Sequence, residues 1–523
     1  MKKKLLIFLL YSIIFSFSLH SFSDNQFSKV KYGGVLRIKS FATSFPIVLD
    51  PTHPLSLRFI SEQLYDNLVR LDKNLNIVPC LANYWTISDD GKIYTFYLRK
   101  GVRFHHGKEF TSSDVVFSFK RLISKRPVST YHRLFIYKIK GAVEYLLGKA
   151  RDISGLRTKG KYIVEIEWRV PFVSALYMFS MPEWKILPKD LLLKEEKDFF
   201  DKPSGTGPFK FDYWIRDTKL NIVGIRLKRN EYYFLGKPYL DAVEFCPFFT
   251  LDNFLNKEID VIPVLSEKVL KGNYPIIGID RLSFTYLGFS CQRLPFNNKK
   301  VRKALSQIIN KKELITLFNQ VHTLPRLTNN YIPPQLPGFL PKSNENFSDI
   351  DKIKKELENL NFKNSTINIF IERKEKRLAR KISRVLKNQL KFLNIKLKIK
   401  FYESKKDILK SKDPYLIFVH YDMDFPEPEN IIVPLFTSQS NFNLFEFVNK
   451  ELDNLIKKAE TEKSWTRRIQ IFNRIEELLE KEVPAIPLYY SQERIAFQDY
   501  VRGIDISPLG LSTINVRKVW LDK

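Results

Sequence analysis

The chain has 523 residues, of which 44% are hydrophobic and 27% are charged. That length exceeds what one hydrophobic core usually serves, so we expect two or three lobes. The formal net charge of +29 is typical of nucleic-acid binders, but the basic residues are scattered through the chain rather than massed in one arm. We therefore expect no nucleic-acid partner.

The first 23 residues have the pattern of a secretory signal peptide. Three lysines at positions 2–4 precede an apolar run over 5–17, and the small residues Ser21 and Ser23 mark a cleavage site that leaves Asp24 first. The run is shorter than the roughly 20 residues that a membrane span needs. The segment carries no cysteine for lipid attachment. The sequence therefore predicts an exported, soluble, periplasmic protein.

The cysteines are too few for a disulfide framework. Cys80, Cys246 and Cys291 are the only three, so at most one disulfide is expected and its partners stay open. None of them lies in a C-x-x-C or zinc-ligand spacing. We expect neither a metal site nor a cofactor.

In the first half of the chain, hydrophobic periodicity predicts short strands and amphipathic helices. A strand is expected over 35–38, a helix over about 57–71 and a second strand over 93–98. Thr111-x-x-Asp114 resembles a capping box that begins another helix. The loop over 205–208 lacks the third glycine, the lysine and the following helix of a phosphate-binding loop.

The clearest pattern lies in the second half. A strand over 366–371 precedes a helix with its apolar stripe between Ile382 and Leu393, and a strand over 395–401 alternates apolar residues with lysines. A further strand is expected over 415–421, and a long amphipathic helix around 469–479. Strands alternating with helices, without a repeat or a flexible linker, predict a mixed α/β fold whose domains the chain enters more than once.

Ordered sequence blocks carry a family resemblance over nearly the whole mature chain. They include Gly34-Val35-Leu36-Arg37-Ile38, Tyr65-Asp66-Asn67-Leu68-Val69, Ser88-Asp89-Asp90-Gly91, Phe110-Thr111-x-x-Asp114-Val115, Gly205-Thr206-Gly207-Pro208-Phe209 and Pro484-x-Ile486-Pro487-Leu488-Tyr489. In these blocks the chain resembles family 5 of the bacterial extracellular solute-binding proteins, which serve oligopeptide and dipeptide ABC transporters.

The resemblance implies a two-lobed, hinged periplasmic-binding-protein clamshell with an additional accessory domain. After the signal peptide, 1–23, lobe I would combine 24–67, 195–283 and 492–523, the accessory domain would span 68–194, and lobe II would span 284–491. It also implies a monomer that binds a peptide and delivers it to the membrane permease of an ABC transporter. Among peptides, the positive net charge favours acidic ones.

A peptide offers a receptor an ammonium, a carboxylate and a backbone. In the family, an aspartate that follows a strand and precedes an acidic-Pro pair by three residues binds the ammonium, and Asp424 stands three residues before Glu427-Pro428. Tyr421 stands where the family usually has a tryptophan, and His420 where a small residue is common. Asp422 is the alternative ligand. Asp424 can instead be a loop carboxylate that caps a turn.

Two further segments resemble ligand contacts of the family. Arg373 stands six residues before Ala379, where dipeptide-binding members place an arginine for the peptide carboxylate. It can equally be one more solvated cation of a basic loop. Thr43, Ser44 and Phe45 resemble the segment that runs alongside the ligand, and an ordinary buried loop is the alternative.

Three other classes of function are alternatives: an enzyme, a receptor for a different ligand, and a protein that binds no small ligand. The chain has no G-x-S-x-G, H-E-x-x-H or glycine-rich nucleotide loop, so we expect no enzyme. The same fold can bind haem, a metal chelate, glutathione or an oligosaccharide. A surface adhesin or chaperone-like protein would bind no small ligand at all.

Overall fold

The computed structural model describes residues 30–39, 47–53, 56–124, 136–264, 266–318, 323–342, 350–360 and 366–523. The described residues form a mixed α/β structure with one 12-stranded sheet, a four-stranded sheet and two two-stranded sheets. Within these residues, no helix is long and apolar enough to cross a membrane. Cys80, Cys246 and Cys291 are all buried and free, so the disulfide left open by the sequence does not form here.

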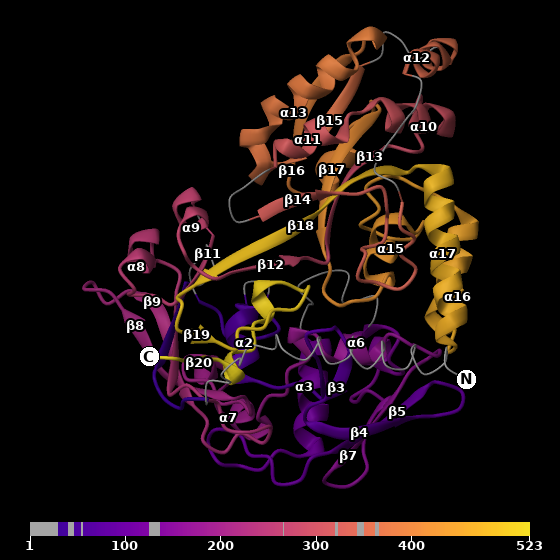
Figure 1. The fold of residues 1–523 in the computed structure, drawn as a ribbon. Coiled ribbons are helices and arrows are strands. Elements are labelled where there is room, and N and C mark those ends of the chain that lie inside the picture. The colour runs from indigo at the N-terminus through magenta and orange to yellow at the C-terminus, as the bar shows by residue number, and fades with distance from the viewer. Residues whose placement is uncertain are drawn as a thin grey trace, which may run out of the picture.

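One long strand, β18 (Ala485–Phe497), runs through both halves of the molecule (Figure 1). Its beginning pairs with β13 (Ser283–Phe289), and its end pairs with β11 (Val261–Pro263) and β12 (Ile276–Asp280). β14 (Thr323–Leu327) pairs with its middle. We call the part formed by β13 to β17 and α10 to α17 the upper half, and the rest the lower half.

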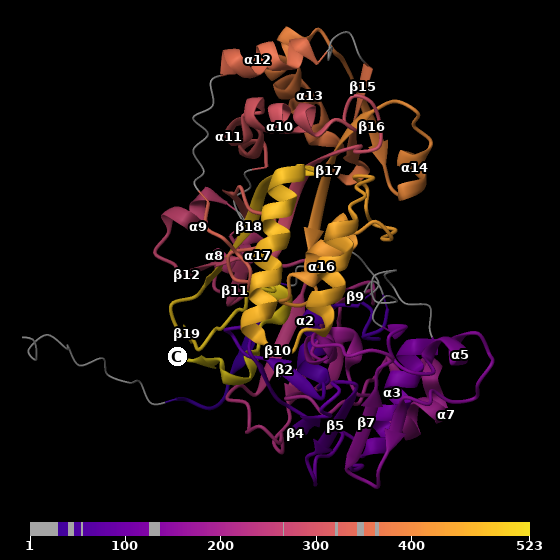
Figure 2. The same ribbon diagram turned by 90° about the vertical axis from the view of Figure 1, so that its right-hand side faces the viewer.

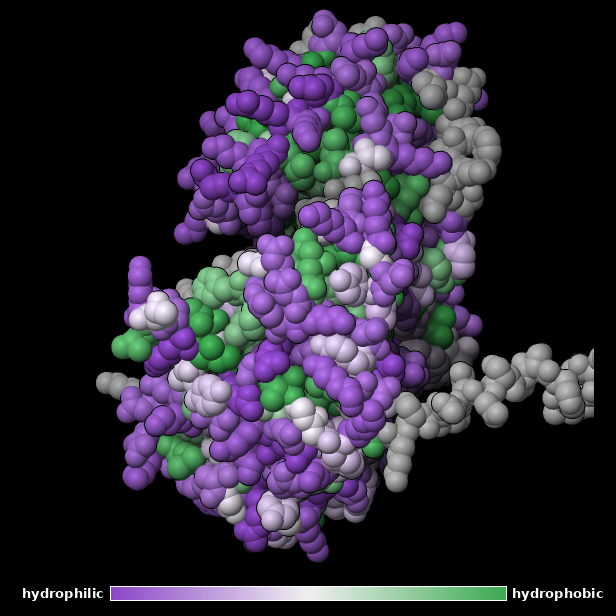
Figure 3. Space-filling model, turned by 60° about the vertical axis from the view of Figure 1, so that its left-hand side comes forward, coloured by the Kyte–Doolittle hydropathy of each residue, from purple (hydrophilic) through white to green (hydrophobic). Residues whose placement is uncertain are grey.

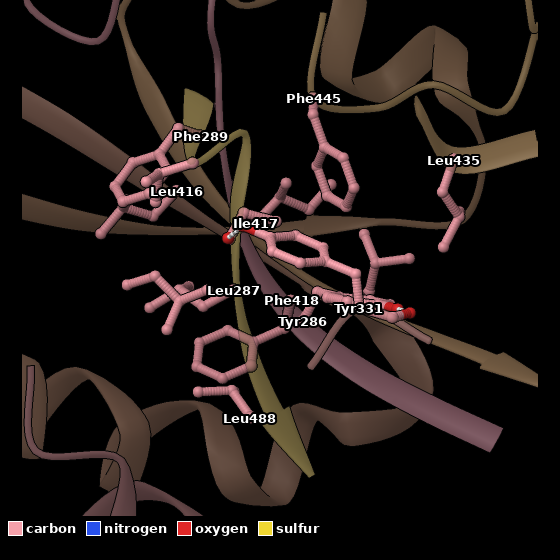
Figure 4. Close-up of a cluster of buried hydrophobic side chains, with 14 of the residues drawn as sticks. Tyr286, Leu287, Phe289, Tyr331, Leu416, Ile417, Phe418, Leu435, Phe445 and Leu488 are labelled. Atoms are coloured by element: carbon pink, nitrogen blue, oxygen red, sulfur yellow. Dashed lines mark hydrogen bonds between the residues drawn. The ribbon is translucent and has the colours of Figure 1, made fainter. Parts of the chain in front are cut away.

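The upper half contains the predicted βαβ unit. β15 (Thr366–Glu372) is parallel to both β16 (Lys396–Tyr402) and β17 (Tyr415–Asp422), and α13 (Lys376–Gln389) connects the first two. β13 is antiparallel to β17. Consecutive residues of β13 and β17 are buried together with residues of β18, so apolar side chains cover both faces of the sheet here (Figure 4).

The lower half holds the other end of the large sheet and a separate four-stranded sheet. The large sheet continues from β11 through β1 (Val35–Lys39) to three further strands, β10 (Ala242–Cys246), β9 (Ile222–Arg229) and β8 (Phe209–Arg216). The small sheet has the order β4 (Ala82–Ile87), β5 (Ile93–Leu98), β7 (Ile163–Glu167) and β6 (Leu156–Thr158). Each sheet lies in its own buried apolar cluster.

The remaining elements connect or cover these sheets. They are α2 (Arg58–Leu64), β2 (Val69–Leu71), β3 (Ile77–Pro79), α3 (Ser112–Ser124), α5 (Ala142–Leu146), α6 (Ala175–Phe179), α7 (Lys189–Phe199), α8 (Leu251–Leu255), α9 (Glu267–Lys271), α10 (Lys299–Ile308), α11 (Lys311–Thr316), α12 (Ile350–Asn359), α14 (Lys405–Leu409), α15 (Glu429–Phe436), α16 (Lys450–Thr461), α17 (Trp465–Glu482), β19 (Val501–Arg502) and β20 (Trp520–Leu521). The three apolar clusters agree in outline with a lobed molecule, but the domain boundaries stay a prediction.

The helix expected over 57–71 ends early, and that expectation was wrong for its second half. α2 stops at Leu64, and residues 69–71 form the strand β2. The buried carboxylate of Asp66 accepts hydrogen bonds from the hydroxyls of Thr206 and Tyr233, both at 2.9 Å. These contacts with distant parts of the chain hold the backbone out of the helix, overriding the local periodicity.

A buried ion network joins the two halves. Arg468 of α17 lies 2.7 Å from Glu427 and 2.9 Å from Glu429, and it donates a hydrogen bond of 2.9 Å to Ser174 of the lower half. Burial raises the pKa of Glu427 to about 7, although Arg468 opposes that shift. Figure 2 shows α16 and α17 side by side, reaching from the upper half to the lower half. The network therefore fixes α17 and the 427–429 segment against the lower half.

We expect Arg468→Met to lower the free energy of unfolding by about 3–5 kcal/mol, because it leaves two buried carboxylates without their cation. Those carboxylates would hold protons more tightly in the folded than in the unfolded chain, so the variant should lose further stability as the pH rises above about 4. Urea unfolding at several pH values measures both effects.

Arg467→Met is the matched control, because Arg467 is 70% exposed and Arg468 only 1%. Its pair with Glu462 lies on the surface and is screened by solvent, so the free energy of unfolding of this variant should stay close to that of the unaltered protein. If both variants lowered the free energy of unfolding equally, the buried network would not be what joins the two halves.

Candidate functional site

Two cavities adjoin each other, the larger one between the two halves and the smaller one at the lower end of the upper half. The smaller has a volume of about 220 Å³ and the larger about 820 Å³, and both are lined by Arg281 and Asp422. Asp422 is the last residue of β17 and Glu372 the last of β15, so the smaller cavity lies at the carboxyl ends of parallel strands. Ligands of open α/β sheets bind at such ends. Figure 3 shows a hollow between the two halves, on a face that is mostly hydrophilic.

Asp424 lies just beyond β17 in the wall of the larger cavity. Its carboxylate accepts a hydrogen bond of 2.8 Å from the guanidinium of Arg58, a residue of α2 in the lower half. Its backbone N–H donates to the side chain of Asn430, which orients the loop. The carboxylate is therefore held at the junction of the halves and is already paired with a cation.

Arg58 is shared between two carboxylates. The same Nη2 that contacts Asp424 lies 3.2 Å from Glu183. Burial alone would lower the pKa of Arg58, but the charges of Glu183 and Asp424 outweigh that effect and raise it well above its ordinary value. A cation that takes Asp424 would thus leave Arg58 with Glu183 as its remaining partner.

Asp422 belongs to a second ion cluster on the same strand end. Arg281 lies 3.2 Å from Asp422 and also pairs with Glu493 of β18. The ring of His420 lies 3.5 Å from Asp422 and 2.9 Å from the hydroxyl of Thr285. Burial alone would raise the pKa of Asp422, but His420 and Arg281 outweigh it and hold the pKa well below its usual range.

Tyr421 faces away from these cavities. Alternate residues of a strand point to opposite faces, so His420 and Asp422 line the smaller cavity while Tyr421 packs against the apolar core of the upper half. Burial, together with the charges of Asp424 and Asp422, raises the pKa of Tyr421 well above its ordinary value. The structure therefore brings together His420, Asp422 and Asp424 and leaves Tyr421 on the other side.

Arg373 is separated from this group. Its side chain is 61% exposed and pairs with Glu403, and it is not among the described residues that line either cavity. Its role as a carboxylate site stays a prediction. Thr43, Ser44 and Phe45 lie outside the described residues.

The sequence did not single out three residues of the site. Arg58 pairs with Asp424, Arg281 pairs with Asp422, and Glu493 pairs with Arg281, yet all three belong to segments far from residue 424 in the chain and carry no motif. The acidic-Pro pair, which the sequence does mark, lies in the buried network of Arg468 instead. In the part of the chain that the structure describes, no group of three or more His, Cys, Asp or Glu side chains is placed to hold a metal ion.

Comparison with known proteins places this chain in a family. Residues 76–443 match the family described as bacterial extracellular solute-binding proteins, family 5 Middle. The Escherichia coli dipeptide-binding protein is 26% identical, over 86% of this chain and 88% of its own length. Heme-binding protein A of Haemophilus influenzae is also 26% identical, over 86% of each chain.

A solved structure agrees with the sequence matches. The periplasmic binding protein DppA from Helicobacter pylori, in complex with the peptide STSA, superposes with a TM-score of 0.73 at 25% identity, covering 94% of this chain and 99% of its own. The predicted α/β fold of periplasmic binding proteins is thereby confirmed. The chain belongs to family 5 of the bacterial extracellular solute-binding proteins, so it is a binding protein and not an enzyme.

Proposed function

We propose that this chain is an extracytoplasmic receptor that captures peptides between two closing lobes and delivers them to an ABC-type importer. The observation that carries the proposal is the carboxylate of Asp424, held at the junction of the halves and bound to a cation. Two similar proteins support it, since one is a dipeptide-binding protein and the other was solved with a peptide. Export to the periplasm and a monomeric state belong to the same proposal.

In this proposal the lobes keep the boundaries expected from the sequence. Lobe I combines 24–67, 195–283 and 492–523, lobe II spans 284–491, and the accessory domain spans 68–194. The separate apolar clusters support this division. The chain passes between the lobes at β18 and at the turn between β12 and β13, so closure would bend these two connections.

The peptide ammonium binds Asp424 by exchange with Arg58. A charge-assisted hydrogen bond from the ammonium replaces the one from the guanidinium, and Arg58 keeps Glu183, which is 3.2 Å away. The carboxylate is paired before and after the exchange, so no lone charge is buried. An N-acetylated peptide has no cation to exchange, and the site therefore selects free N-termini. Arg373 remains the proposed partner of the peptide carboxylate.

Haem is the second candidate, favoured by the similarity to Heme-binding protein A. Against it, both ring nitrogens of His420 are engaged, one by Thr285 and the other by Asp422. That histidine is consequently not poised to bind iron. A purified protein that is coloured and absorbs near the haem Soret band would favour this second function.

We expect free di- to pentapeptides, and not their N-acetylated forms, to raise the melting temperature of the protein that begins at Asp24. At a ligand concentration of 100 Kd the stabilisation is about 2.7 kcal/mol. Asp424→Asn should abolish the shift, whereas Asp152→Asn, at a 79% exposed carboxylate of the lower half, should leave it unchanged. No shift with any peptide, in protein stripped of carried-over ligand, would refute the peptide function.

Arg58→Gln should bind free peptides more tightly, because it removes the cation that competes for Asp424. A partly exposed ion pair is worth up to about 1 kcal/mol, which corresponds to a roughly fivefold lower Kd. Titration calorimetry measures the change, and Arg474→Gln, at a 50% exposed surface pair, is the control with no expected effect. Weaker binding by Arg58→Gln would mean that Arg58 serves the ligand instead of competing with it.

A further inference from the structure

The smaller cavity has a net negative lining in a strongly basic protein. Four carboxylates line it, from Glu372, Glu375, Asp422 and Glu493, against two permanent cations, Arg281 and Lys374. The ring of His420 also lines it, between Asp422 and Thr285. We call this cavity, defined by those four carboxylates and two permanent cations, the acidic pocket. The chain as a whole carries a net charge of +29, so this local excess of negative charge is opposite in sign to its surroundings.

Both cations of the pocket are already in ion pairs with its carboxylates. Arg281 pairs with both Asp422 and Glu493, and Lys374 lies 2.8 Å from Glu372. The carboxylate of Glu375 makes no hydrogen bond or ion pair with any described residue, although the side chain is partly buried in the pocket wall. A partly desolvated carboxylate is stabilised by a cationic partner. One more positive charge in the pocket would therefore pair with Glu375 and be bound favourably.

The walls between these charges are apolar. Phe318, Ile371 and Phe418 line the same cavity, and the ring of Tyr489 lies beside them. Lysine and arginine side chains bury their hydrocarbon stems along apolar surface while the charged end reaches polar groups. A leucine would leave Glu375 unpaired, and an acidic side chain would be repelled. The combination of apolar wall and acidic rim fits a long basic side chain.

The acidic pocket is continuous with the proposed ammonium site. Arg281 and Asp422 line both it and the larger cavity, whose wall contains Asp424. A peptide with its ammonium on Asp424 would thus present a side chain near its N-terminus to the acidic pocket. We propose that this pocket is a subsite for a basic side chain, so that the receptor prefers peptides carrying lysine or arginine near the N-terminus. This inference rests on the proposed peptide function.

The positive charge on the surface around the pocket does not reverse the preference for basic side chains. Residues 373–412 carry 16 basic and 3 acidic side chains, so the basic residues are less evenly spread than the sequence first suggests. Arg373, at the start of this segment, pairs with Glu403. At physiological ionic strength exposed charges are screened over about 8 Å. The contacts inside the pocket, and not the net charge, should decide which peptide binds.

The test is titration calorimetry with matched tripeptides, in which alanine flanks one variable residue: lysine, uncharged norleucine or glutamate, placed in turn at each position. At the first or second position, the lysine peptide should bind roughly fivefold more tightly than the norleucine peptide, and the glutamate peptide should bind most weakly. Glu375→Gln should abolish most of the lysine advantage and leave norleucine binding unchanged. Glu356→Gln, an exposed glutamate of α12, is the matched control and should behave like the unaltered protein.

The outcomes separate the two proposals. A lysine advantage that disappears in Glu375→Gln supports the subsite. Equal binding of the three peptides, or an advantage that survives Glu375→Gln, overturns the subsite and leaves the peptide function standing. If no tripeptide binds at all, the peptide function itself fails, and the preference for basic side chains fails with it.

Discussion

The backbone hydrogen bonding of β18 is the constraint on which the rest of the structure depends. Every peptide group of a buried strand needs a partner, and a strand of 13 residues is too long for one neighbouring strand to satisfy. Its two ends therefore pair with strands from different halves of the molecule. This arrangement aligns β13 beside β18 and β17 beside β13, and it brings the carboxylates at the end of β17 to the junction of the halves.

The ion pairs at this junction are of two kinds, which differ in burial. Around Arg468 the ion pairs are almost fully buried and join the halves, so breaking them is costly. Around Arg58 and Arg281 the pairs are partly open to solvent and line cavities, so a ligand can exchange with them. The same acidic sequence run, from Asp422 to Glu429, supplies both sets. The first three residues of that run line the larger cavity, and the glutamates at its end pair with Arg468.

Local patterns in the sequence predict much of the fold and part of the site. The βαβ unit between 366 and 421 was confirmed, because 366–371 and 415–421 are rich in apolar residues, 396–401 alternates apolar residues with lysines, and the helix between has an apolar stripe. The second half of the helix expected at 57–71 was wrong, because the carboxylate of Asp66 accepts hydrogen bonds from Thr206 and Tyr233, which are distant in the chain. Asp424 follows from the family motif. Its partner Arg58 is 366 residues away, and no spacing or periodicity in one sequence reports such a contact.

A crystal structure of the protein with the tripeptide Ala-Lys-Ala would decide whether Asp424 binds the peptide ammonium. We expect the ammonium to lie within about 3 Å of the Asp424 carboxylate, as charge-assisted hydrogen bonds require. Arg58 should then contact Glu183 alone, and the lysine side chain should occupy the acidic pocket. A bound peptide remote from Asp424, with the Arg58–Asp424 pair intact, would contradict the account.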